Sequence, residues 1–124
     1  MPAFGDLEAE IMDVVWSTDE PVTVRHVVDR LNEQRAVAYT TVQTVAEILF
    51  RKGWLQRSKV RRAYQYWPTR SRADYTAGLV AEALSATPDR AAALVRLFDH
   101  LDPGEVAELR AALNSAKTAK NRSQ

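Results

Sequence analysis

Residues 36–67 read AVAYTTVQTVAEILFRKGWLQRSKVRRAYQYW. Wound as a helix at about 100° per residue, residues 40–52 separate into an apolar side and a polar side. The apolar side holds Val42, Val45, Ala46 and Leu49, and the polar side holds Thr40, Gln43, Thr44 and Arg51. The spacing therefore predicts one helix face that lies in a core. The other face, with hydroxyls, an amide and a cation, is available to contact another molecule.

The residues after this helix predict a β-hairpin. Gly53 has the position of a helix C-cap. Trp54–Ser58 and Ala63–Trp67 are short aromatic-rich runs typical of strands, and Lys59–Arg62 would form the tip between them. Because two strands alone are only marginally stable, we expect the hairpin to pack on the helices through Leu55 and some of its aromatic residues.

The net charge of +1 conceals a strong segregation of charge along the chain. Residues 51–72 carry eight Lys or Arg and no acidic residue, whereas residues 1–50 carry three basic and nine acidic residues. A basic run by itself is often only a solvated surface. Here it coincides with the hairpin and follows an amphipathic helix, which favours nucleic acid as the partner. The alternative is a protein-interaction module whose basic hairpin docks an acidic partner protein.

Two further amphipathic helices precede this stretch. Apolar residues recur with helical spacing in Leu7–Val15, and we expect Asp6 to cap that helix. A second helix is predicted by Val24, Val27, Val28 and Leu31, with Thr23 at its N-cap. Arg25 lies near its start, within reach of a phosphate, and an ordinary solvated side chain is the alternative. Three helices and a hairpin predict a winged helix-turn-helix in residues 1–70, in a fold that is mostly α with a small β-hairpin wing.

The composition argues against several classes of protein. The chain of 124 residues has no Cys, which removes disulfides and thiolate metal sites, and His26 and His100 lie far apart without ligand-like neighbours. We therefore expect neither a metal nor a cofactor. Without a carboxylate pair beside a histidine, or a Gly-rich phosphate loop, we do not expect an enzyme. No apolar run exceeds five residues, so we expect no membrane span or signal peptide, and a cytoplasmic location.

Helical periodicity returns in the C-terminal part of the chain. Three apolar stripes predict three short helices in residues 71–115, and residues 116–124 are expected to form a mobile tail. Thr87-Pro88 and Asp102–Glu105 have the pattern of helix starts. Because three short helices hold little apolar surface for a core of their own, we expect them to pack against a second copy of the chain. The alternative is that they pack on their own winged unit. The candidate dimerisation residues are Tyr75, Leu79, Val80, Leu84, Leu94, Leu97, Phe98, Leu101, Val106, Leu109 and Leu113.

Several segments carry a family resemblance, namely LEAEIMDVVW, VTVRHVVDRL, AYTTVQT, RKGWL and RRAYQYWP. Over nearly its whole length the chain resembles the penicillinase repressor family, the BlaI/MecI-type bacterial winged-helix repressors. The resemblance implies a homodimer that binds an inverted-repeat operator, often with TACA/TGTA half-sites, and represses genes for β-lactam resistance or related stress functions. It places the recognition helix at Tyr39–Lys52. With the second helix and the hairpin tip included, the candidate DNA contacts are Arg25, Tyr39, Thr40, Thr41, Gln43, Thr44, Arg51, Lys52, Lys59, Arg61 and Arg62.

The chain departs from the family pattern in several places. Relatives commonly have Arg where this chain has Ile48, and the neighbouring Glu47 can pair with Arg51 at i, i+4. In members that answer β-lactams, a membrane-bound sensor protease leads to a cut at an Asn-Phe bond in the dimerisation half. Leu97-Phe98 occupies that position here, so we expect control by another route or a cut elsewhere. The Cys cluster of copper-responsive relatives is absent from this cysteine-free chain.

Overall fold

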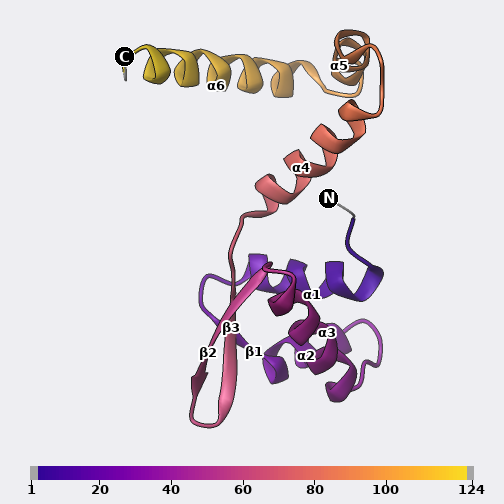
Figure 1. Cartoon of the computed structure of the whole chain (residues 1–124), viewed down its shortest axis with the longest axis vertical. Helices are drawn as coiled ribbons and strands as arrows, with labels where there is room; N and C mark the ends of the chain where they lie inside the picture. The colour runs from indigo at the N-terminus through magenta and orange to yellow at the C-terminus, as the bar shows by residue number, and fades with distance from the viewer. Residues whose placement is uncertain (1–2, 123–124) are drawn as a thin grey trace. The chain divides into compact units, whose positions relative to one another are not determined.

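The structure is a computed structural model that describes residues 3–122, with side chains described as far as residue 118. The elements labelled in Figure 1 are α1 (Asp6–Ser17), β1 (Val22–Thr23), α2 (Val24–Asn32), α3 (Tyr39–Arg51), β2 (Leu55–Val60), β3 (Ala63–Pro68), α4 (Arg72–Ser85), α5 (Arg90–Phe98) and α6 (Pro103–Arg122). The chain divides into two compact units, one up to Val80 and one from Ala81 onward. Among the described residues, no helix combines the length and apolarity needed to cross a lipid bilayer.

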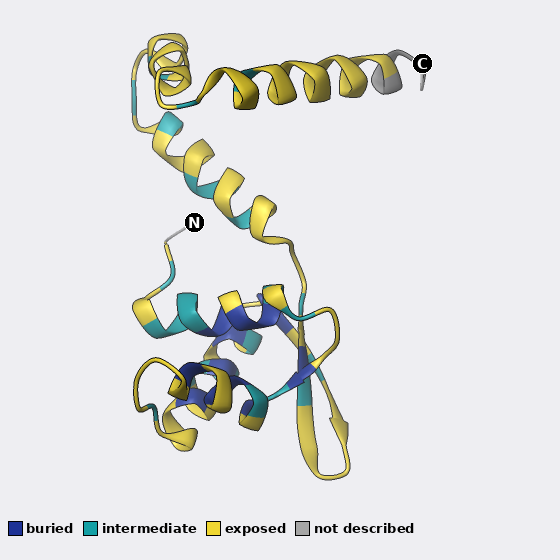
Figure 2. Ribbon diagram, turned by 180° about the vertical axis from the view of Figure 1, so that it is seen from behind, coloured by how far each residue is buried: buried dark blue, intermediate teal, exposed yellow. Residues whose placement is uncertain are grey.

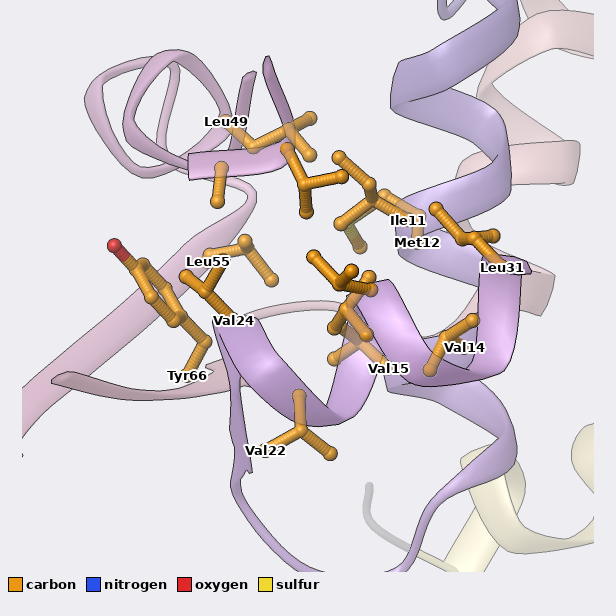
Figure 3. Packing of buried hydrophobic residues seen from close by; sticks show 14 of the residues in the cluster. Ile11, Met12, Val14, Val15, Val22, Val24, Leu31, Leu49, Leu55 and Tyr66 are labelled. Atoms are coloured by element: carbon orange, nitrogen blue, oxygen red, sulfur yellow. The ribbon is translucent and has the colours of Figure 1, made fainter. Parts of the chain in front are cut away.

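The first unit is built around one hydrophobic core (Figure 2). Helices α1, α2 and α3 pack against one another, and α1 and α3 also contact the sheet. Figure 3 shows core side chains from these helices and from the strands pointing toward a common interior. The buried residues are Ile11, Met12, Val14, Val15, Val22, Val24, Val27, Val28, Leu31, Val42, Ala46, Leu49, Trp54, Leu55 and Tyr66. Most of them belong to the apolar stripes read from the sequence, because helical spacing brings the members of a stripe to one side.

The first two helices begin with different chemistry. Gly5 is the N-cap of α1, and its N–H donates to the Glu8 carboxylate at 3.0 Å. The prediction that Asp6 caps this helix is wrong, because Asp6 is already its first residue. The predicted cap of α2 is confirmed, since the Thr23 hydroxyl accepts a hydrogen bond from the His26 N–H at 3.1 Å. The second helix is therefore anchored where the polypeptide leaves β1.

The C-terminal end of α3 has the predicted glycine cap. Gly53 has a φ of 87°, and its N–H donates to the Phe50 carbonyl at 3.0 Å. The Trp54 N–H donates to the Leu49 carbonyl, also at 3.0 Å. These two bonds form a Schellman motif, which needs the left-handed conformation that glycine adopts without a steric penalty. The chain turns directly from α3 into β2.

The sheet has the strand order β1-β3-β2, and both pairs are antiparallel. The predicted hairpin is confirmed, and its ladder continues to the pair Val60↔Ala63. The turn is therefore Arg61-Arg62 rather than the four predicted residues Lys59–Arg62, because the strands extend further than expected. Strand β1 was not predicted; its Val22 lies opposite Tyr66. This third strand joins the wing to the start of α2.

The beginning of α4 belongs to the first unit. The Tyr75 ring stacks on Phe4 with centroids 4.1 Å apart, and the Tyr75 hydroxyl accepts a hydrogen bond from the Phe4 N–H at 2.8 Å. Trp16 and Trp54 complete this aromatic cluster, with centroids 5.8 and 5.3 Å from the Tyr75 ring. Tyr75 is one of the predicted dimerisation residues, and the C-terminal region is predicted to begin at residue 71. In the structure this ring packs inside the first unit, which extends past it.

The second unit contains α5 and α6, which both have capped starts. The Asp89 carboxylate accepts from the Ala92 N–H at 3.0 Å and caps α5, so the predicted start at Thr87-Pro88 is wrong. The capping box predicted in Asp102–Glu105 is confirmed by reciprocal hydrogen bonds of 2.8 and 3.2 Å. Helix α6 continues to Arg122, so residues 116–122 of the predicted tail are helical, and residues 123–124 lie outside the described residues. Ala and Lys in this segment are good helix formers.

Candidate nucleic-acid interface

The polar face of α3 is open to solvent. Thr40, Thr41, Gln43 and Thr44 are exposed, and Tyr39 is 38% exposed in the first turn. No side chain caps the start of α3, because the N-cap residue is Ala38, so the first N–H groups can bind an anion. The Thr44 hydroxyl donates to the Thr40 carbonyl at 2.9 Å and keeps its lone pairs for an outside donor. This face offers hydrogen-bond donors and acceptors rather than apolar surface.

A hollow of about 310 Å³ lies between α2, the start of α3 and the wing strands. Five of the predicted DNA contacts line it, namely Arg25, Tyr39, Gln43, Lys59 and Arg62. The Arg25 guanidinium lies over the Tyr39 ring at 4.8 Å from its centroid, a cation–π contact that joins α2 to α3. The fold therefore brings cations from α2 and from the wing to the polar start of α3.

The wing ends in a turn of two arginines. Arg61 and Arg62 have φ values of 50° and 71°, and both are exposed. Two residues with positive φ match the twist of a tight hairpin, and Asn-Gly is the pair usually favoured there. For a residue with a Cβ, this conformation costs about 1 kcal/mol or more. Two cations are thus held at the tip of the projecting hairpin at a cost in stability, which is a feature of functional sites (Figures 1 and 2).

Two of the predicted contacts also bind carboxylates of the chain itself. Lys52 Nζ lies 2.9 Å from Glu8 and ties the end of α3 to α1. Burial by itself raises the pKa of Glu8, but the Gly5 N–H and Lys52 stabilise the charged form and lower the pKa below its usual value. Arg51 Nε lies 3.4 Å from Glu47, and the Arg51 side chain is 75% exposed. The Glu47–Arg51 pair expected from the i, i+4 spacing is therefore present, and Arg51 still faces solvent.

Arg57 lies in the same region but was not among the predicted contacts. Its guanidinium donates to Glu47 and lies 4.0 Å from the ring centroids of both Phe50 and Tyr64. A hydrogen bond with Tyr66 raises the pKa of Arg57 against the effect of burial, and Glu47 adds to the rise. The sequence contained a signal for this position of Arg57. Alternate residues of a strand share one face, and Arg57 lies two positions after the buried Leu55, so both side chains should face the helices.

The predicted dimerisation residues are mostly accessible. Within residues 81–118, every side chain is exposed or half-buried, so this part of the second unit has no buried core. The exposed candidates are Val80, Leu94, Leu97, Phe98, Leu109 and Leu113, and the half-buried ones are Tyr75, Leu79, Leu84, Leu101 and Val106. Val95, which was not predicted, is 66% exposed. An apolar hollow of about 170 Å³ between α5 and α6 is lined in part by Phe98, Val106, Leu109 and Leu113.

The first unit has the architecture of winged helix-turn-helix DNA-binding proteins, in which a polar helix follows a short turn and a basic hairpin lies beside it. Residues 4–115 match the family model described as Penicillinase repressor. The chain belongs to the penicillinase repressor family, as its sequence motifs predicted.

Known relatives agree with this assignment. Over 112 residues the chain is 41% identical to the transcriptional regulator BlaI of Mycobacterium tuberculosis, covering 88% of this chain and 81% of the relative. It is 30% identical to the DNA-binding domain of the repressor BlaI in a solution structure, with a TM-score of 0.53 over 60% of this chain and 89% of that domain. A transcriptional regulator from Thermotoga maritima shares the fold at 19% identity, with a TM-score of 0.50 over 97% of this chain and 78% of that protein. The chain is therefore a transcriptional repressor of the BlaI type and not an enzyme, and the predicted fold class is confirmed.

Proposed function

We propose that the chain is a cytoplasmic homodimeric repressor that binds an inverted-repeat operator, with one winged unit on each half-site. The observation that carries this proposal is the hollow beside α3, which Arg25, Lys59 and Arg62 line together with Gln43. A duplex that enters this region meets phosphate-binding cations on two sides of a helix whose polar face is accessible. Phosphate contacts then set the position of the helix, and base contacts set the sequence.

The exposed residues of α3 suit base reading. Gln43 has an amide that can bind adenine with two hydrogen bonds in the major groove, and Thr40 and Thr44 supply hydroxyls and methyl groups for neighbouring bases. The cations of the wing suit phosphates, which carry no sequence information. Arg61 and Arg62 lie at the exposed tip, where their guanidinium groups are accessible to a DNA backbone.

Dimerisation through the C-terminal part is the second element of the proposal. Its support is the accessible apolar surface of α5 and α6, including Leu97, Phe98 and Leu113, which are 44%, 42% and 59% exposed. Covering these side chains with a second copy removes them from water and creates two-fold symmetry. A symmetric dimer reads a palindrome with two identical helices, which is why an inverted repeat with TACA/TGTA-type half-sites is the expected operator.

Control of β-lactam resistance or related stress genes is the biological role that we propose. A membrane sensor protease system acting indirectly is a candidate partner, but the family cut position holds Leu97 and Phe98 rather than Asn and Phe, so we expect no control by that cut, or a cut elsewhere. These two residues end α5, and a protease would need this helix to open locally before it could bind an extended segment. Release through dimer dissociation or a bound ligand is the alternative route.

The test is fluorescence anisotropy with full-length protein. Duplexes from the upstream region of its own gene and from neighbouring genes are compared with scrambled duplexes over a series of salt concentrations. The double variant Arg61→Ala/Arg62→Ala should weaken binding to all duplexes alike and flatten the slope of log K against log salt by roughly two. The control Arg30→Ala/Arg90→Ala removes the same charge outside the interface and should leave the slope nearly unchanged. Equal slopes for the two double variants would refute the role of the tip, and binding without salt dependence would refute DNA binding itself.

A further inference from the structure

Glu47 forms salt bridges with two guanidinium groups at once. Its Oε1 lies 3.4 Å from Arg51 Nε within α3, and its Oε2 accepts from Arg57 Nη1 in β2. The Glu47 side chain is 34% exposed, so the carboxylate lies at the edge of the interface rather than in the core. Because both oxygens already have cationic partners, Glu47 is poorly placed to accept a hydrogen bond from a cytosine amino group, which is the usual way a carboxylate reads a base.

The Arg57 side chain connects α3 with both strands of the wing. Its guanidinium lies between the rings of Phe50 in α3 and Tyr64 in β3, 4.0 Å from each centroid, and its side chain is only 16% exposed. Arg57 itself belongs to β2 and lies opposite Tyr66 in the ladder. Stacking on two rings fixes the plane of the guanidinium, and the Glu47 carboxylate fixes its direction. The Glu47–Arg57 ion pair therefore helps to set the angle of the wing relative to α3, together with the hydrogen bond between Arg57 and Tyr66.

Arg51 is held much more loosely than Arg57. It pairs with Glu47 over a single turn of helix, and its side chain is 75% exposed. An exposed i, i+4 pair is weak, so a DNA phosphate that comes close can compete with Glu47 for Arg51. The two arginines that pair with Glu47 therefore have different roles. Arg57 holds the wing against α3, and Arg51 is available to bind a DNA phosphate.

We infer that Glu47 determines operator specificity without touching a base: it positions the wing against α3 through Arg57 and competes with phosphate for Arg51. This inference rests on the proposed DNA-binding function and concerns the same interface. Sequence-specific binding needs α3 and the wing to meet the groove and the backbone together, so a fixed wing angle favours the operator. Binding to random DNA depends mainly on phosphate contacts, so restraining Arg51 weakens it.

The principal test is Glu47→Gln, which keeps the size of the side chain and removes its charge. Release of Arg51 should steepen the salt slope on random duplex by about 0.9 and raise affinity for random duplex roughly eightfold at 0.1 M salt. Because the wing is also loosened, we expect the ratio of operator affinity to random-duplex affinity to fall at least about tenfold. The double variant Glu47→Gln/Arg51→Ala should return the salt slope to that of the wild type while the ratio stays low. Glu33→Gln is the control for a general effect of net charge on DNA affinity, because Glu33 is exposed and lines a different hollow beside α1. If net charge alone were the cause, Glu33→Gln would change the salt slope and the affinity as much as Glu47→Gln.

A second variant tests the positioning role separately. Arg57→Met keeps an unbranched side chain between the rings of Phe50 and Tyr64 but has no guanidinium for Glu47. It should lower the operator-to-random ratio without steepening the salt slope. An unchanged ratio in both Glu47→Gln and Arg57→Met would overturn the inference while the wild-type protein still discriminates its operator. If the wild-type protein shows neither discrimination nor salt dependence, the proposed function fails and the inference fails with it.

Discussion

Replacing the tip arginines with the residues that this turn prefers should separate stability from DNA binding. Arg61 and Arg62 have φ values of 50° and 71°, which are left-handed conformations that disfavour most residues with a Cβ. Asn and Gly adopt them readily, and Asn-Gly is the preferred pair in tight two-residue hairpin turns. The variant Arg61→Asn/Arg62→Gly should therefore gain about 1–2 kcal/mol of folding free energy.

The gain in stability should appear as a higher melting temperature of the winged unit. For a unit of this size, each kcal/mol corresponds to roughly 4–8 °C. Unfolding can be followed by the fluorescence of Trp16 and Trp54, whose rings lie in the aromatic cluster around Phe4. The same variant loses two cations, so its salt slope on DNA should flatten by about 1.8, and its affinity should fall roughly 60-fold at 0.1 M salt. A more stable protein should thus be a weaker DNA binder.

The matched control is Arg61→Lys/Arg62→Lys, which keeps both charges and gains no preference for positive φ. Its melting temperature and salt slope should stay close to those of the wild type. Two results would refute the reasoning in different ways. A raised melting temperature with an unchanged slope would show that the tip does not contact phosphates. An unchanged melting temperature in the Asn-Gly variant would show that the arginine turn is not strained.

Gln43→Ala should weaken binding to the best operator by about 1–3 kcal/mol and binding to random duplex much less, and equal losses in anisotropy titrations would contradict base reading by Gln43. A chain truncated to residues 1–80 should fold as a monomer and bind a palindromic operator roughly 100- to 10,000-fold more weakly than full length, because the second half-site is no longer tethered. Sedimentation measures the oligomeric state, and anisotropy measures the affinity. Undiminished affinity would count against dimerisation through the C-terminal part. The pKa of Glu8 lies below 4.5 in the folded state, so its contribution to stability is present above pH 4.5 and is lost as the pH falls through the folded pKa. Urea unfolding across this range should show a smaller acid-induced loss of stability in Glu8→Gln, with Lys52 left unpaired, and an identical pH profile would rule out this role. After exposure of host cells to a β-lactam, mass spectrometry should find no cut at the Leu97-Phe98 bond, and fragments with those ends, appearing as the operator is released, would show that the usual family mechanism applies.

Local sequence patterns predicted much of the fold because their physical causes act over a few residues. The cap of α2 needs only Thr23 and the N–H groups of the next turn, and the capping box of α6 needs residues three positions apart. Gly53 ends α3 for an equally local reason, its access to positive φ. The same approach failed for α1, where Asp6 and Gly5 both suit an N-cap and the local pattern did not choose between them.

What the sequence determined by itself was therefore the helices, the hairpin and the position of the basic run, since periodicity and charge are properties of neighbouring residues. Strand β1 has only two residues and owes its existence to β3, more than forty positions later in the chain. The hollow that unites Arg25 with Arg62, and the salt bridge between Glu47 and Arg57, likewise join separate elements. Only the tertiary structure decided them, because periodicity shows which face of an element is buried but not which other element it meets in the shared core.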